Sequence, residues 1–269
     1  MVFDMLSRWI APLKGKAPAR QILIFGDSHT VAIAQAFAFR ASNPEPVLPV
    51  MDLYRLRKSK GNIQIGDTDL QEFCRKISGL NPSDAVFSAI GGNQYAVVST
   101  VRSPPFFDLA TNMEAAGIVA ADSSVIPVRV LESYIESGVV NSDGPMLKKI
   151  RDSTRARVFH LTPPPPKEDN DFIKQFHEAR FAAEGLGNLE PHPPALRLAC
   201  WNMQRKSLST FCAEIGVELL PPPPVTVGEG GFLERHYYGK DVTHANRRYG
   251  EQVLRQIAAV AEVFEMAER

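Results

Sequence analysis

Two short segments at opposite ends of the chain carry the residue types that nucleophilic catalysis needs. Gly26-Asp27-Ser28 follows an apolar run and precedes a helical pattern. A helix that begins there directs its N-terminal amides toward Ser28, which could serve as a nucleophile and as a donor to an oxyanion. Asp241 and His244 lie three residues apart in a turn before the last helical pattern. At this spacing the carboxylate can hold the Nδ1 proton of the imidazole, which leaves Nε2 to take a proton from a serine hydroxyl.

A third segment, Gly91-Gly92-Asn93, follows another apolar run. The side-chain amide of Asn93 could donate a hydrogen bond to an oxyanion that develops on an acyl carbon. Each segment also has a simpler interpretation, because serine, threonine and aspartate are ordinary helix caps, and two glycines with an asparagine commonly form a turn. Taken one at a time, the segments do not distinguish catalysis from local structure.

The order of the three segments favours catalysis. GDS after the first predicted strand, GxN after the third and DxxH before the last helix resemble the blocks of the SGNH hydrolase superfamily, also called the GDSL-type esterases and lipases. The resemblance spans residues 21 to 264. It implies a catalytic triad of Ser28, His244 and Asp241. It also implies an oxyanion hole formed by Ser28, Asn93 and a glycine of the second family block, with no metal ion or other cofactor.

The chain departs from the family pattern at three points. His29 replaces the leucine of the GDSL name, which we expect to affect the pocket rather than the chemistry. Gln94 replaces the aspartate of the GxND block, so Asn93 must be supported in another way. No clear motif marks the glycine of the second block. Gly61, in KSKGN after the second predicted strand, is the first candidate, and Gly66 is the next.

Alternating strands and helices must bring these segments together. Apolar runs bounded by turn residues predict strands at 21–25, 47–53, 85–90, 157–162 and 217–220. Apolar residues at helical spacing predict helices at 29–41, 70–77, 195–215 and from 245 onward. This alternation is typical of a parallel sheet, whose ligands bind beyond the carboxyl ends of the strands. We therefore predict an α/β fold, namely a flavodoxin-like three-layer α/β/α sandwich with about five parallel strands.

The length of the chain favours one domain. Its 269 residues, 44% of them hydrophobic, suffice for one well-buried core. We expect an N-terminal extension at residues 1–20 and a single SGNH hydrolase-like domain at residues 21–269. The pattern becomes irregular after Asn93, over a stretch longer than an ordinary loop. This predicts an insertion at residues 95–126, near the site.

The charged residues argue against some classes of partner. Thirty basic residues balance thirty acidic ones, so the chain has no net positive field for a phosphate backbone, and we expect no nucleic acid partner. The basic run from Arg55 to Lys60 could attract an anionic substrate, although a solvated loop is the simpler interpretation. The sequence contains no P-loop, GxGxxG, HExxH or GxSxG motif, which disfavours nucleotide-binding, zinc-protease and lipase-like α/β-hydrolase functions.

Several features predict a cytoplasmic protein. Asp4 and Arg8 interrupt the apolar residues near the N-terminus, so no signal peptide is expected. No segment approaches the roughly twenty apolar residues that cross a bilayer, so we expect no transmembrane segment. The three cysteines form no CxxC pair and are expected to be free thiols in a reducing compartment.

These observations predict a serine esterase that hydrolyses carboxylic esters, among them acetyl esters of carbohydrates, through a Ser-His-Asp triad and an acyl-enzyme. The expected partner is therefore a small-molecule or carbohydrate ester. Two other functions fit the same residues. An O-acyltransferase would use a sugar hydroxyl or another hydroxyl in place of water. A noncatalytic binding protein could retain the fold, as Gln94 and the unclear second block allow.

Overall fold

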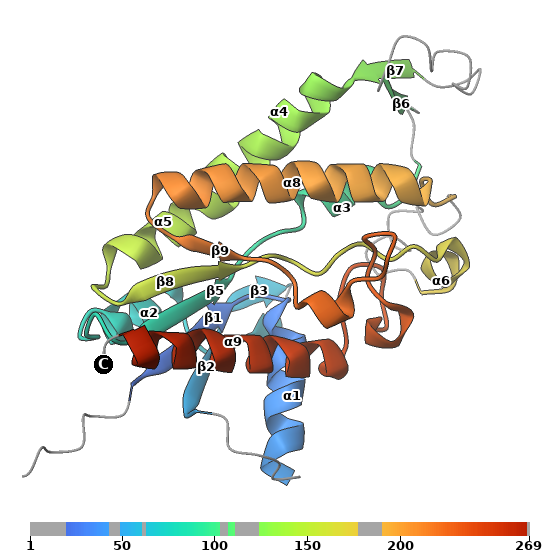
Figure 1. Ribbon diagram of the computed structural model, residues 1–269. Coiled ribbons are helices and arrows are strands. Elements are labelled where there is room, and N and C mark those ends of the chain that lie inside the picture. The colour runs from blue at the N-terminus through green and yellow to red at the C-terminus, as the bar shows by residue number, and fades with distance from the viewer. Residues whose placement is uncertain are drawn as a thin grey trace, which may run out of the picture.

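A sheet of five parallel strands runs through the middle of the computed structural model (Figure 1), which describes residues 20–42, 49–60, 63–102, 107–110, 124–176 and 190–267. The strands lie in the order β2-β1-β5-β8-β9, which is 2-1-3-4-5 when these five are numbered along the chain. This is the flavodoxin-like order, and it reverses direction between β1 and β5. The predicted α/β fold with five parallel strands is confirmed. The bounds of the strands are Ile22–Gly26 for β1, Met51–Arg55 for β2, Ala85–Ala89 for β5, Arg157–Leu161 for β8 and Glu218–Leu220 for β9.

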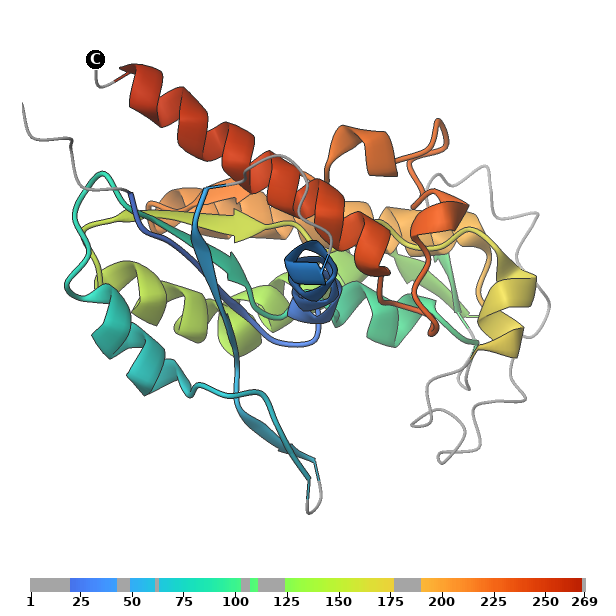
Figure 2. The ribbon, with the colours of Figure 1, turned by 90° about the horizontal axis from the view of Figure 1, so that it is seen from below.

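Helices cover both faces of the sheet (Figure 2). One face packs against α1 (Thr30–Ser42) and α9 (Arg247–Ala267). The other packs against α2 (Leu70–Ile77), α5 (Gly144–Asp152) and the C-terminal end of α8 (Pro194–Glu214). The three layers explain why β1 and β5 are buried at every position: strands in the middle of a parallel sheet are covered on both faces.

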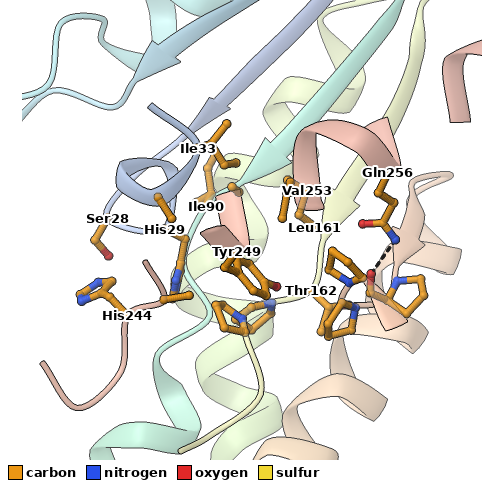
Figure 3. Close-up of a pocket in the computed structure, with 18 of the residues that line it drawn as sticks. Ser28, His29, Ile33, Ile90, Leu161, Thr162, His244, Tyr249, Val253 and Gln256 are labelled. Atoms are coloured by element: carbon orange, nitrogen blue, oxygen red, sulfur yellow. Dashed lines mark hydrogen bonds between the residues drawn. The ribbon is translucent and has the colours of Figure 1, made fainter. Parts of the chain in front are cut away.

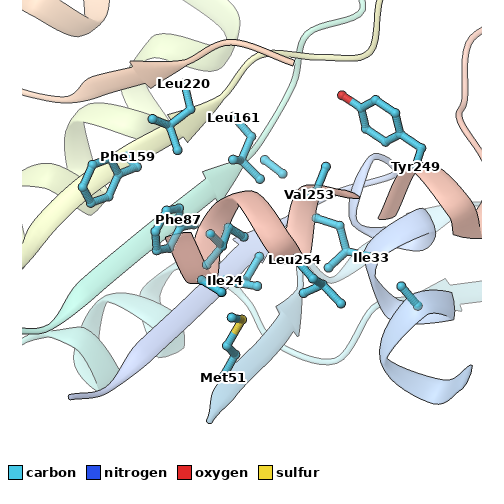
Figure 4. Close-up of a cluster of buried hydrophobic side chains, with 14 of the residues drawn as sticks. Ile24, Ile33, Met51, Phe87, Phe159, Leu161, Leu220, Tyr249, Val253 and Leu254 are labelled. Carbon is cyan, nitrogen blue, oxygen red and sulfur yellow. The ribbon is translucent and has the colours of Figure 1, made fainter. Parts of the chain in front are cut away.

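Alternate residues of β1 supply the two cores. Ile22 and Ile24 face α1 and α9, whereas Leu23 and Phe25 face α2 and α5. In the first core, Figure 4 shows Ile24 with Val253 and Leu254 of α9. Each large apolar side chain that is fully buried in this way contributes roughly 1.5–3 kcal/mol to the free energy of unfolding.

The connections differ from the sequence-based expectation in two places. The basic segment after β2 contains a short antiparallel hairpin of β3 (Lys58–Lys60) and β4 (Ile63–Ile65) rather than a plain loop. The predicted insertion contains α3 (Gln94–Ser99) and two strands that pair in parallel, β6 (Phe107–Ala110) and β7 (Ser124–Pro127). Residues 103–106 and 111–123 of the insertion, and residues 1–19 of the predicted N-terminal extension, lie outside the described residues.

Further helices connect the sheet and the insertion. The sequence analysis did not predict α4 (Val128–Gly138), which continues through a π-helical turn, η2 (Val139–Asp143), into α5. Single turns of helix complete the fold at α6 (Asn170–Gln175), η4 (Pro224–Thr226) and η5 (Arg235–Tyr237). The three cysteines are buried free thiols. Among the described helices, none has the length and apolar character that crossing a membrane requires.

Two helices approach each other closely at the start of α9. Gly250 packs against the backbone of α1, where an added Cβ atom would lie 2.0 Å from the carbonyl oxygen of Ala32. No side chain fits at that distance. This contact therefore sets the separation of the two helices at the end where each follows a predicted site segment.

We expect Gly250→Ala to lower the free energy of unfolding by about 1–3 kcal/mol, because the methyl group collides with backbone rather than with a mobile side chain. Without the collision, alanine in place of glycine would stabilise a helix by about 1 kcal/mol. Denaturant unfolding followed by circular dichroism measures the change. Gly79→Ala is the matched control, since an added Cβ atom there meets nothing within 4 Å. A Gly250→Ala protein as stable as the wild type would contradict the close approach.

Candidate active site

Ser28 lies at the carboxyl end of β1, where the chain turns into α1. Just before this turn β1 and β5 approach closely: an added Cβ atom on Gly26 would lie 2.4 Å from the carbonyl oxygen of Ala89. The Thr30 amide and hydroxyl donate to the carbonyl oxygen of Asp27, and the Val31 amide donates to that of Ser28. The Ser28 hydroxyl makes no capping hydrogen bond to α1 within the described residues. The capping interpretation of this serine is therefore wrong.

Asp241 and His244 form a hydrogen-bonded pair in the turn before α9. The Asp241 Oδ2 atom lies 2.8 Å from His244 Nδ1, while Oδ1 accepts the backbone amides of Thr243 and His244 at 3.0 and 2.7 Å. Burial alone would raise the pKa of the Asp241 carboxyl, but these hydrogen bonds and the nearby imidazole hold it well below its usual range. The carboxylate is therefore ionised and fixes the orientation of the ring.

The fold brings the two predicted segments together. Ser28 and His244 line the same pocket, and Figure 3 shows the serine hydroxyl facing the imidazole ring. Asp241 Oδ2 holds the same ring through Nδ1. This arrangement is suited to nucleophilic attack by Ser28 with His244 as the base.

The loop that carries Asn93 is supported by a residue that belongs to none of the predicted motifs. Gly91 and Gly92 have φ angles of +69° and +92°, and an added Cβ atom on Gly91 would overlap the carboxylate of Asp143. That carboxylate, at the end of η2, accepts the Gly92 amide at 3.0 Å and the side-chain amide of Gln94. Gln94 is therefore bonded to the Asn93 loop through Asp143. The carboxylate that supports this loop comes from Asp143 rather than from the position after Asn93.

Gln204 of α8 supports the same loop from the other side. Its Nε2 atom donates to the carbonyl oxygen of Gly92, and its Oε1 atom accepts the amide of Tyr95, both at 2.8 Å. Gln204 is fully buried. The sequence analysis missed both Asp143 and Gln204. A Gly-Pro pair after Asp143 marks a turn, but no local signal distinguishes a glutamine in the middle of a helix.

The second-block glycine remains a prediction. Gly61 lies outside the described residues. Gly66 has a φ angle of +82°, and its backbone packs against Leu56, so that an added Cβ atom would lie 2.3 Å from the Leu56 carbonyl oxygen. This close approach gives Gly66 a structural reason to be glycine. In the described part of this connection, the amides of Leu56 and Arg57 already donate to Gly26 and Thr68.

Two histidines, the half-buried His29 and the buried His160, have lowered pKa values. His29 lines the pocket, with its ring centroid 5.5 Å from that of His244. Burial, reinforced by His244, lowers the pKa of His29 to about 4. Burial also lowers the pKa of His160, at the end of β8, to about 4, with His29 adding to the effect. Both imidazoles are therefore neutral near pH 7.

No family model and no curated protein matches the sequence. Among solved structures, the chain is similar to a GDSL-like lipase from Bacteroides thetaiotaomicron, with 10% identity, a TM-score of 0.43, and coverage of 91% of this chain and 88% of that one. It is also similar to an extracellular lipase from Streptomyces rimosus, with 12% identity, a TM-score of 0.43, and coverage of 89% and 100%. A third is the periplasmic domain of a Salmonella Paratyphi A lipopolysaccharide acetyltransferase, with 12% identity, a TM-score of 0.44, and coverage of 91% and 84%. At these identities and scores, the likeness says nothing about the substrate.

A buried lysine holds the turn that carries Asp241 and His244. Lys167, only 1% exposed, donates from Nζ to the carbonyl oxygens of Gly239, at 3.0 Å, and Asp241. The ammonium group also lies 4.7 and 5.1 Å from the ring centroids of Phe172 and Tyr238. Burial lowers the pKa of Lys167 to about 8. The sequence analysis assigned no role to this lysine, which follows the four prolines after β8.

We expect the free energy of unfolding to fall as the pH is lowered from about 6.5 to about 4. His29 and His160 have a pKa of about 4 in the folded protein, whereas a histidine in an unfolded chain has a pKa of about 6.5. In this window the unfolded chain binds more protons, so acidification favours unfolding by up to about 1.4 kcal/mol per pH unit for each histidine. Urea unfolding at a series of pH values measures the slope.

A matched pair of variants tests whether a buried histidine causes this dependence of the unfolding free energy on pH. His160→Gln removes one buried imidazole and should make the pH dependence shallower, while His236→Gln, at an exposed position, should leave it unchanged. Equal slopes for the wild type and His160→Gln would contradict a neutral buried imidazole at position 160.

We expect Lys167→Met to slow the reaction of Ser28 with a fluorophosphonate, a reagent for activated serines, by about tenfold. The substitution leaves two carbonyl groups of the Asp241 turn without their donor and should lower the free energy of unfolding by about 1–3 kcal/mol. Lys174→Met, on the surface of α6, removes an exposed lysine as a control. Normal labelling kinetics in a folded Lys167→Met protein would show that this lysine does not position the turn.

Proposed function

We propose that this protein is a serine hydrolase of the SGNH superfamily that cleaves carboxylic esters through an acyl-enzyme on Ser28. One observation carries the proposal: Asp241 Oδ2 lies 2.8 Å from His244 Nδ1, and the hydroxyl of Ser28 faces the same imidazole. Because the ionised carboxylate fixes the ring, its Nε2 atom is directed to the proton that must leave the serine.

In the first half of the reaction, Ser28 Oγ attacks the carbonyl carbon of the ester while its proton passes to Nε2 of His244. The carbonyl electrons move to oxygen and form a tetrahedral oxyanion. When this intermediate collapses, the bond to the alcohol oxygen breaks, and the proton on Nε2 passes to that oxygen. The alcohol leaves, and the acyl group remains on Ser28.

The oxyanion requires hydrogen-bond donors that are in place before the reaction. The backbone amide of Ser28, at the start of α1, and the side-chain amide of Asn93 are the proposed donors. Asp143 and Gln204 fix the backbone on both sides of Asn93, which keeps its amide in place as charge develops. Gly61 is the proposed third donor.

In the second half, a water molecule attacks the acyl carbon while His244 takes one of its protons. The second tetrahedral intermediate collapses with return of that proton to Ser28 Oγ, which releases the carboxylic acid and restores the enzyme. Asp241 stabilises the imidazolium that exists in each half.

Labelling with a fluorophosphonate tests the proposal. The wild-type protein should be modified at Ser28, as peptide mass spectrometry would show, and Ser28→Ala should not react. His244→Ala removes the base and should slow labelling by about a hundredfold or more. Ser42→Ala, at an exposed serine of α1, is the control that should react like the wild type.

A folded wild-type protein that fails to react would overturn the proposal and favour a noncatalytic binding protein with the same fold. Circular dichroism of each variant separates loss of the base from loss of structure.

A further inference from the structure

A groove of about 690 Å³ opens onto Ser28 and His244. Its walls are the start of α1, the loop from Tyr238 to Asp241 and the first turn of α9. This volume falls within the range of small-molecule sites. Because both reacting side chains line the groove, a ligand that fills it lies next to the scissile bond.

The pocket that Ser28 and His244 share with Ile33 and Leu161 is much smaller. It encloses about 30 Å³ and has mainly apolar walls (Figure 3). A cavity of this size takes about two water-sized groups. An acetyl group or another short acyl group suits this pocket, so the larger alcohol part of an ester belongs in the groove.

The groove carries three basic side chains, Lys240, Arg247 and Arg248. Lys240 and Arg248 are exposed, while the guanidinium of Arg247 lies 3.7 Å from the ring centroid of Phe39. Within the described part of the chain, none of the three forms an ion pair. Asp241 is the one carboxylate among the described residues that line the groove. The Oδ2 atom of Asp241 is hydrogen-bonded to His244.

This charge is local to the groove. The whole chain has a formal net charge of zero, so the three cations do not reflect a general excess of basic residues. The N-terminus of α9 begins at Arg247 and adds a partial positive charge on the same side. Such a concentration of one sign beside a reacting serine attracts and orients ligands of the opposite sign.

We propose that the alcohol part of the ester carries a negative charge, as a carboxylate, phosphate or sulfate, which Lys240 and Arg248 bind in this groove. The inference rests on the proposed function, because the position of the groove beside Ser28 assigns it to the alcohol part. The substrate class is thus a short-chain ester of an anionic alcohol.

Two matched esters test the proposal: the acetate of 3-(4-hydroxyphenyl)propanoic acid and the acetate of the corresponding primary amide. Two methylene groups insulate the charge from the phenol oxygen, so both leaving groups are similar, and a difference in kcat/KM reports recognition. We expect kcat/KM to be about tenfold higher for the carboxylate ester at low ionic strength. The advantage should fall at 1 M salt, where the Debye length is about 3 Å. A phosphonate in place of the carboxylate identifies which anion is preferred.

The double variant Lys240→Gln, Arg248→Gln should bring the ratio of kcat/KM for the two esters close to one. The double variant Lys148→Gln, Lys206→Gln is the matched control. It also removes two exposed positive charges, but from α5 and α8, and should keep the wild-type ratio. A ratio that falls equally in both double variants would show that only the net charge matters and would overturn the proposal.

Binding separates failure of this inference from failure of the proposed function. Calorimetry with Ser28→Ala should show tighter binding of 3-(4-hydroxyphenyl)propanoate than of its amide. If the wild type hydrolyses both esters equally well, the anion proposal is wrong and the hydrolase stands. If neither ester is hydrolysed and Ser28 is also unreactive, the proposed function is wrong. In that case the calorimetric comparison alone tests whether the groove prefers an anion. Equal binding of the carboxylate and the amide would overturn the anion proposal.

Discussion

The packing of α1 against α9 is the contact on which the site depends. Ser28 precedes α1 and His244 precedes α9, so the separation of the two helices sets the separation of hydroxyl and imidazole. Gly250 allows the backbones to meet at Ala32, and the apolar residues of both helices share one core with β1 and β5. The site is therefore held by the main hydrophobic core rather than by loops alone, and a small shift between these helices would move the imidazole of His244 away from the Ser28 hydroxyl.

Polar side chains from distant parts of the chain support the loops around this contact. Asp143 and Gln204 hold the loop of Asn93, and Lys167 holds the turn of Asp241. Burying such groups costs free energy unless they form hydrogen bonds, so each of them stabilises one arrangement of its loop over the alternatives. These supports hold the Asn93 loop and the Asp241 turn in place in a site that opens to solvent.

The surroundings of Ser28 differ on its two sides. A small pocket with apolar walls lies toward the sheet, and a large groove with three cations lies toward the surface. One side suits a short acyl group and the other a charged, hydrated alcohol. Net charge does not predict this contrast, since the thirty basic and thirty acidic residues of the chain cancel. The local arrangement of charge, rather than its sum, decides which ligands the protein can hold.

The sequence by itself determined the strand and helix alternation, the five parallel strands, and the three segments that carry Ser28, Asn93 and the Asp241–His244 pair. Such features are local: apolar periodicity marks the elements, and polar residues after strands mark the edge where ligands bind. Only the tertiary structure decided how Asn93 is supported, because Asp143 and Gln204 are ordinary residues until the fold places them beside its loop. It also decided that Lys240 and Arg248 share a groove with Ser28, since the start of α1 and the start of α9 become neighbours only when both helices pack on one face of the sheet.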